Sequence, residues 1–75
     1  MPNRYTELTD QSPMPYGAHV NTKMEKVPAS YLLWMWNDGV RAAVDEDSKR
    51  GTVARYIRDN MNALKMDDPD TLVEP

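Results

Sequence analysis

The longest apolar run of the chain lies within residues 27–39, VPASYLLWMWNDG, and this stretch predicts a short central helix. Pro28 suits the first helical position, where its missing N–H costs no hydrogen bond. Gly39 suits the residue just past the helix end, where φ is often positive. The apolar side chains point in several directions around this helix. Because such a helix is either wrapped by its own domain or partly covered by something else, the pattern leaves open whether it is core or contact surface.

A second apolar pattern predicts an amphipathic helix over residues 48–66. Its apolar positions recur at helical spacing: Val53, Tyr56, Ile57, Met61 and Leu64. The start is open, because Gly51 lies near the first turn and three residues are candidate caps: Asp47, Ser48 and Thr52. The sequence Asp67-Asp68-Pro69 predicts the end, because acidic side chains oppose the helix dipole there and proline cannot continue a helix. Between the two helices, residues 40–44 predict one or two short helical turns.

The N-terminal part has a weaker pattern. Residues 13–27 alternate loosely between apolar and polar side chains, which predicts a short β-hairpin or an irregular ribbon. Two prolines favour extended backbone there, and the pair Tyr16-Gly17 marks a turn. We expect this ribbon to lay Met14, Tyr16 and Met24 against the central helix. The predicted fold class is therefore α+β, with the ribbon packed on a central apolar helix and a C-terminal amphipathic helix.

Length and composition predict one small domain. Residues 13–66 form the expected domain, between a flexible N-terminal segment (1–12) and an acidic, flexible tail (67–75). A chain of 75 residues buries only about 60% of its unfolded surface, so we expect modest stability. Cysteine is absent, and no apolar run approaches the roughly 20 residues of a membrane span. No signal-peptide core is visible at the N-terminus, so a soluble cytoplasmic protein is predicted.

Residues 9–39 resemble a small bacterial and phage domain family, the "putative quorum-sensing-regulated virulence factor" family. Its motif is of the type Met-Pro-Phe-Gly-Lys-Tyr-Lys-Gly, followed by Val-Pro and Tyr-Leu-x-Trp-Leu-x-x-x-Gly. The matching residues here are Met14, Pro15, Tyr16, Gly17, Met24, Val27, Pro28, Tyr31, Leu32, Trp34 and Gly39. A terminal helix similar to VARYIRDNMNALK also follows in many members, so the similarity covers most of residues 9–66.

The chain departs from the family pattern in two places. Ala18, His19, Val20 and Asn21 replace the Lys-x-Lys-Gly half of the motif, so two positive charges and a glycine are missing. Residues 40–51 look like extra length between the main helices. A similar segment is appended to some DnaQ-like exonucleases, and the resemblance therefore implies an accessory role in nucleic-acid transactions. It also implies a location in the cytoplasm of a bacterium or a phage-infected host.

Charge suggests a first functional hypothesis. Residues 48–66 carry five basic side chains and one acidic one, between two acidic segments. One helical stripe contains Arg55, Arg58, Asn62 and Lys65, and Lys49 and Arg50 extend it toward the N-terminus. Such a row can neutralise phosphates of DNA or RNA, although an ordinary solvated helix face has the same pattern. The first hypothesis is a non-catalytic accessory module that binds the nucleic-acid backbone weakly.

Aromatic residues suggest a competing hypothesis. Trp34, Trp36, Tyr31 and Tyr56 can offer a stacking platform or an anchor for a partner, or they can simply be the core of a domain without phenylalanine. The candidate partner-binding residues are Leu33, Trp34 and Trp36. The second hypothesis is a protein-interaction module, such as a phage-type modulator of a host protein, that uses this helix and the acidic patches. Homodimerisation through the same helix is a third.

Catalytic and metal chemistry are not predicted. The only histidine, His19, has no partners at metal-ligand spacing. The acidic triplet at residues 45–47 lacks the spacing and the loop glycine of an EF-hand. No nucleophile elbow, phosphate-binding loop or Cys/His pair occurs. We therefore expect no enzyme activity, no cofactor and no metal.

Overall fold

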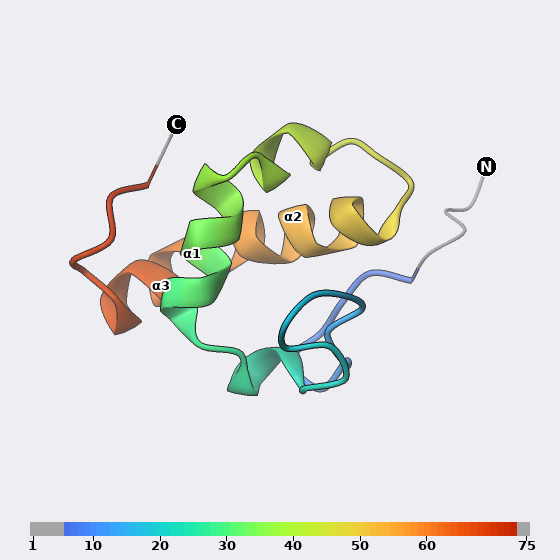
Figure 1. Ribbon diagram of the computed structural model, residues 1–75, viewed down its shortest axis with the longest axis horizontal. Coiled ribbons are helices and arrows are strands. Elements are labelled where there is room, and N and C mark those ends of the chain that lie inside the picture. Colours follow the sequence, from blue (N-terminus) through green and yellow to red (C-terminus); the bar gives the residue numbers. More distant parts are fainter. Residues whose placement is uncertain (1–5, 74–75) are drawn as a thin grey trace.

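A computed structural model describes residues 6–73 of the chain, and every helix in that range is short (Figure 1). In chain order the elements are the 3₁₀ helix η1 (Met24–Lys26), α1 (Ala29–Asn37), the 3₁₀ helix η2 (Val40–Ala43), α2 (Lys49–Asp59) and α3 (Met61–Asp67). Helix α1 crosses in front of α2 at a steep angle, and α3 follows α2 toward one end of the molecule (Figure 1). Both α1 and η2 pack on α2, which is therefore the centre of the fold.

The predicted α+β class is wrong, because the described residues contain helices and no β-strand or sheet. Residues 13–27 form an irregular loop that ends in η1. Its only ladder-like feature is one isolated antiparallel bridge between Pro13 and Lys23. The chain does fold back on itself there, since Met14 N donates to the carbonyl oxygen of Thr22 at 2.8 Å. The expected hairpin is thus reduced to a single point of pairing.

Two local features explain why no hairpin forms. Pro13 and Pro15 have no N–H, and the bridge at Pro13 is formed by the N–H groups of Met14 and Met24; past it, Asn21 N donates to the carbonyl oxygen of Met14, so the pairing leaves regular register. Gly17 and Asn21 have φ values of 93° and 71°, which turn the backbone sharply at both ends of the tip. The weak alternation in the sequence therefore reflects which side chains are buried and not a strand.

The central helix is confirmed with a shift of one residue at its start. Helix α1 begins at Ala29, and Pro28 is the N-cap residue, whose carbonyl oxygen accepts from the N–H of Tyr31 and of Leu32. The placement of Pro28 as the first helical residue is therefore wrong by one position. Gly39 follows the helix end with φ of 125°, as the sequence predicted. Past it, the chain continues directly into η2.

The predicted helix over 48–66 is interrupted at Asn60, which has φ of −111° and ψ of 15°. Its side-chain Nδ2 donates to the carbonyl oxygen of Tyr56 at 2.8 Å, a local side-chain bond that competes with helix continuation. As a result α2 ends at residue 59 and α3 begins at residue 61. At the other end Ser48 is the N-cap, because its hydroxyl oxygen accepts from the N–H of Gly51 at 3.1 Å.

The core lies between the loop, α1 and α2. Its largest fully buried side chains are Met14, Met24, Leu32, Leu33, Val53 and Ile57. The start of α2 also carries a close backbone approach. A Cβ atom on Gly51 would lie 1.9 Å from the carbonyl oxygen of Glu46, so only glycine allows the connecting loop to rest on the helix here.

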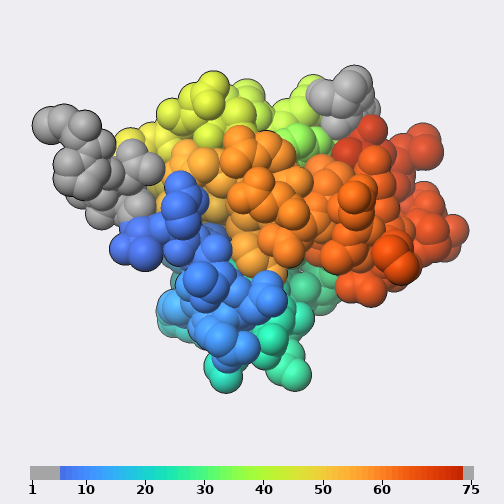
Figure 2. Space-filling view, turned by 180° about the vertical axis from the view of Figure 1, so that it is seen from behind, coloured from blue at the N-terminus to red at the C-terminus, as the bar shows by residue number. Residues whose placement is uncertain are grey.

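Both ends of the described range contact the helices. Seen from behind, residues 6–12 lie beside α2 (Figure 2), and Glu7 forms an ion pair with Arg55. Near the C-terminus, Asn37 Nδ2 donates to the carbonyl oxygen of Leu72. The flexibility of residues 1–12 and 67–75 stays a prediction, and residues 1–5 and 74–75 lie outside the described range. No helix within residues 6–73 combines the length and apolarity needed to cross a membrane.

Candidate binding cleft

An open cleft of about 410 Å³ lies where α1, the start of η2, the start of α2 and the loop tip meet. Its volume is within the range of sites that hold small ligands or single side chains. Most of the lining is apolar or aromatic, and two charged residues complete it. The lining residues are Tyr16, Tyr31, Trp34, Met35, Asp38, Val40 and Arg50.

One wall of the cleft is aromatic. Tyr31 and Trp34 are three residues apart on α1 and therefore share a face, with ring centroids 5.8 Å apart and ring planes tilted by 33°. His19 packs edge-on against Tyr31 at a centroid distance of 4.5 Å. The hydroxyl of Tyr31 also accepts from the N–H of Ala18 at 3.3 Å. Tyr31 is thus held from two sides, while Trp34 is 55% exposed.

Gly17 allows the loop to reach this wall. Its φ of 93° lies in the region that favours glycine, and a Cβ atom there would come within 2.8 Å of the hydroxyl oxygen of Tyr31. Glycine is therefore required both for the turn and for the space that the tyrosine occupies. Because the chain turns at Gly17, the preceding residue, Tyr16, lines the cleft.

The opposite end of the cleft is polar. Arg50 donates from Nη2 to the carbonyl oxygen of Gly39 at 3.3 Å, which joins α2 to the end of α1. Within residues 6–73 no carboxylate forms an ion pair with Arg50. The guanidinium lies beside the hydroxyl of Tyr16 without meeting hydrogen-bond geometry. Burial raises the pKa of Tyr16, and the positive charge of Arg50 opposes this rise, so the phenol stays protonated at neutral pH.

The hydroxyl of Tyr16 is unusual because it is closed off from solvent and has no hydrogen-bond partner in the described part of the chain. A buried polar group without a partner costs free energy, and most proteins avoid it. Here the group belongs to a residue that lines an open cleft. A bound molecule can reach this hydroxyl only if Tyr16 or a neighbouring side chain moves.

The structure separates the three candidate partner-binding residues. Leu33 is fully buried, so the expectation that it is exposed is wrong. Trp36 is partly buried and packs against the core. Trp34 alone of the three is exposed and lines the cleft. Trp34 is also a residue of the family motif, and it lies between Leu33 and Met35, which are both buried.

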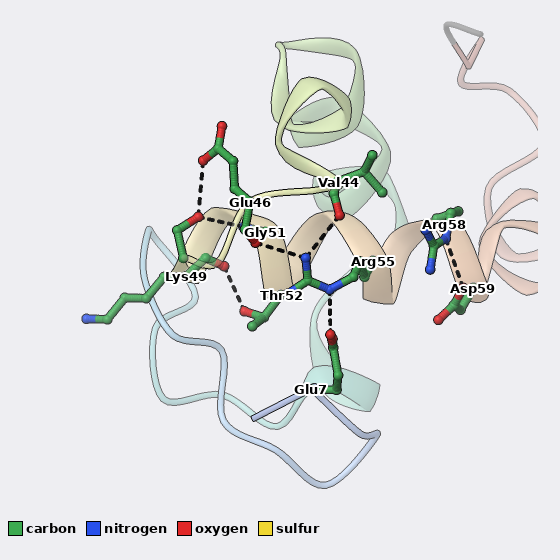
Figure 3. A network of polar contacts seen from close by, with 10 residues as sticks. Glu7, Val44, Glu46, Lys49, Gly51, Thr52, Arg55, Arg58 and Asp59 are labelled. Carbon is green, nitrogen blue, oxygen red and sulfur yellow. Dashed lines mark hydrogen bonds and ion pairs between the residues drawn. The ribbon is translucent and has the colours of Figure 1, made fainter. Parts of the chain in front are cut away.

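Arg55, at the centre of the predicted basic stripe, makes contacts with three other residues of the fold (Figure 3). Its Nε donates to Glu7 in an ion pair, and its Nη1 donates to the carbonyl oxygens of Val44 at 3.0 Å and Glu46 at 2.9 Å. The Arg55 side chain is only 13% exposed. It therefore joins the N-terminal segment, the connecting loop and α2, and its charge is already matched by that of Glu7.

The other members of the predicted stripe lie on two helices and differ in their surroundings. Arg50 lines the cleft, and Arg58 is exposed and paired with Asp59 at 3.1 Å (Figure 3). Lys49 is exposed at the start of α2. The break at residue 60 places the remaining two exposed members, Asn62 and Lys65, on α3.

A smaller hollow of about 190 Å³ lies near the C-terminal end of α2, where residues of α3, the start of α1 and the loop also line it. Tyr56 lines it and donates its hydroxyl to Oδ1 of Asp10 at 2.8 Å. Burial, and next the hydrogen bond to Asp10, raise the pKa of Tyr56 strongly. Glu25 and Asp67 also line this hollow. No group of three or more histidine or acidic side chains within residues 6–73 has an arrangement that could hold a metal ion.

Sequence reasoning found the aromatic wall and missed the polar end of the cleft. Trp34 and Tyr31 were visible as aromatic residues at helical spacing. Arg50 was assigned to a basic stripe, because nothing local shows that the start of α2 folds beside the end of α1. The turn at Tyr16-Gly17 was the one available signal that loop residues reach the same site.

The fold and the cleft define a small helical domain with one open aromatic site. The chain belongs to the family described as "Putative quorum-sensing-regulated virulence factor", whose model matches residues 2–44 and therefore more than half of the chain. The matched range contains α1 and the aromatic wall, and it ends before α2. No curated protein and no solved structure matches the chain.

Proposed function

We propose that this protein is a non-catalytic interaction module that holds part of a partner protein in the cleft at Trp34. The observation that carries the proposal is an exposed tryptophan beside a tyrosine and an arginine, around one cleft. Tryptophan, tyrosine and arginine are the residues that most often dominate the binding energy of protein interfaces. Since Tyr31 is already held in place by its own contacts, the site loses little entropy when a partner binds.

The placement of Arg55 also favours this function over the nucleic-acid hypothesis. Its guanidinium bonds to Glu7 and to two backbone carbonyls, so it is not available to a phosphate. Without Arg55, the predicted stripe lacks its central basic side chain. The aromatic cleft, in contrast, is open and has a volume of about 410 Å³.

The test is capture of a partner from a bacterial lysate, followed by titration of the purified partner in a calorimeter. We expect Trp34→Ala to weaken binding by about 30-fold or more, as hot-spot truncations do. Met66→Ala is the matched control, because Met66 is a large, 82% exposed apolar side chain on α3 and lies outside the cleft. A partner that binds both variants equally, or the absence of any partner that depends on Trp34, would refute the proposal.

Weak binding of DNA or RNA is the second candidate function. It is favoured by Lys49, Arg58 and Lys65, which remain exposed on α2 and α3. If these side chains neutralise phosphates, affinity falls as salt concentration rises, and the slope decreases for each lysine or arginine removed. Fluorescence anisotropy with single- and double-stranded oligonucleotides at several salt concentrations measures both quantities. Binding that is unchanged in Arg58→Ala and Lys65→Ala, or absent at low salt, would exclude this function.

A further inference from the structure

The polar end of the cleft presents hydrogen-bond donors that the protein itself leaves unused. The hydroxyl of Tyr16 is buried and unpartnered. The guanidinium of Arg50 has five N–H groups, of which one reaches the carbonyl oxygen of Gly39, and no carboxylate within residues 6–73 pairs with it. Two donors, one of them charged, therefore lie side by side. An anionic acceptor is the group that satisfies both at once, and a carboxylate does so with two oxygen atoms.

The remaining lining is suited to an apolar side chain. Tyr31, Trp34, Met35 and Val40 supply aromatic and aliphatic surface directly beside this polar end. Asp38 also lines the cleft and is exposed, and it forms no ion pair with Arg50. The site is thus amphipathic over a short distance, with an apolar wall beside an end that carries the guanidinium.

The size of the cleft limits how the two groups of a ligand can be connected. A volume of about 410 Å³ has room for one large side chain and the backbone next to it. An acidic side chain and an apolar side chain would come from two residues and would need more space. The last residue of a polypeptide carries both groups on one Cα atom, and capture of a chain-terminal carboxylate is an established mode of peptide recognition.

We propose that the cleft binds the C-terminal residue of its partner protein, with an apolar or aromatic side chain against Trp34 and Tyr31 and the free α-carboxylate on Arg50 and the hydroxyl of Tyr16. This inference rests on the proposed function and specifies the part of the partner that is recognised. The bound carboxylate provides the missing acceptor for the Tyr16 hydroxyl.

The test uses the full chain and two synthetic peptides that end in phenylalanine, one with a free carboxylate and one with a C-terminal amide. Isothermal titration calorimetry measures binding, because it does not depend on the tryptophan that Trp34→Ala removes. We expect the free carboxylate to bind about tenfold or more tightly than the amide, because charge-assisted hydrogen bonds are lost in the amide. Arg50→Gln and Tyr16→Phe reduce this preference, whereas Lys49→Gln, at the preceding exposed position, does not. Tyr16→Phe removes only a hydroxyl that has no partner in the free protein, so it keeps the fold.

The outcomes separate this inference from the proposed function. Equal binding of the two peptides, both lost in Trp34→Ala, would refute carboxylate recognition and leave the interaction function intact. Lack of binding by either peptide, together with a captured partner that depends on Trp34, would refute it in the same way. N-Acetylphenylalanine added alone provides a third arm. If it binds as tightly as the free-carboxylate peptide and the preference depends on Arg50, the recognition of one terminal residue is supported. If it binds much more tightly than the peptide, the site is one for small acids and the inference fails.

Discussion

Replacement of Gly51 by alanine tests how the connecting loop is held on α2. Gly51 lies in the first turn of α2, where alanine ordinarily stabilises a helix by about 1 kcal/mol relative to glycine. Here an added Cβ atom would lie 1.9 Å from the carbonyl oxygen and 2.8 Å from the carbonyl carbon of Glu46. Both are backbone atoms, so neither can rotate away. The loop has to move by roughly 1 Å or more to restore van der Waals contact.

The size of the effect follows from what that movement breaks. Arg55 Nη1 donates to the same carbonyl oxygen of Glu46 at 2.9 Å. Loss of a charge-assisted hydrogen bond costs about 1.5–3 kcal/mol, and overpacking adds about 1–3 kcal/mol. After the gain in helix propensity, we expect Gly51→Ala to lower the free energy of unfolding by about 1.5–5 kcal/mol. For a domain of this size, that loss lowers Tm by about 6–40 °C.

Thermal and urea unfolding, followed by far-UV circular dichroism, measure this loss. Asn62→Ala is the control, because Asn62 is exposed on α3 and alanine improves helix propensity there without a clash. We expect its free energy of unfolding to equal or slightly exceed that of the unmodified protein. If Gly51→Ala is as stable as the unmodified chain, the loop can leave α2 at no cost, and the contact between Glu46 and α2 does not contribute to folding.

Three further predictions concern burial, capping and pH. Leu33→Ala lowers the free energy of urea unfolding by about 2–5 kcal/mol, because Leu33 is fully buried. Trp34→Ala changes the same free energy by about 1 kcal/mol or less, because Trp34 is 55% exposed. Equal losses in the two variants would contradict this placement. Ser48→Ala removes the N-cap hydrogen bond and lowers the same quantity by about 1 kcal/mol, and an unchanged Tm would show that the cap is dispensable. Stability falls as pH rises above about 10, because the pKa values of Tyr16 and Tyr56 are raised in the folded state and the unfolded chain therefore loses its protons first. Urea midpoints across this range measure the fall, which Tyr56→Phe reduces; an identical fall in that variant would refute the assignment.

The helices could be predicted from the sequence because their signals are local. The apolar stripe of α2 contains Val53 and Ile57, and both are fully buried as the periodicity requires. Gly39 ends α1 with positive φ, and Ser48 caps α2, which was one of three candidates. In each case the residue acts on backbone within four positions, so one stretch of sequence contains the whole interaction.

The features that were missed depend on residues far apart in the chain. Arg55 looks like an exposed member of a basic stripe until the N-terminal segment places Glu7 beside it. Arg50 has the same appearance, although it folds against the carbonyl of Gly39. Asn60 is a partial exception, because an asparagine inside a helical pattern is a weak local warning that its side chain can compete with the backbone. Periodicity shows which face of a helix is polar, but it does not show which polar residues will find partners.

The all-round apolar character of α1 has a structural reason. Leu32 and Leu33 point into the core, while Tyr31 and Trp34 form the wall of the cleft, so one helix supplies both core side chains and the wall of the cleft. This aromatic wall lies inside the range matched by the family model, whereas Arg50 lies outside it. The apolar part of the site therefore lies in the segment that the family model matches, and Arg50 comes from α2. If the cleft binds a C-terminal residue as we propose, a related chain with the same wall but no cation at the start of α2 is expected to hold an apolar side chain without a preference for a free carboxylate.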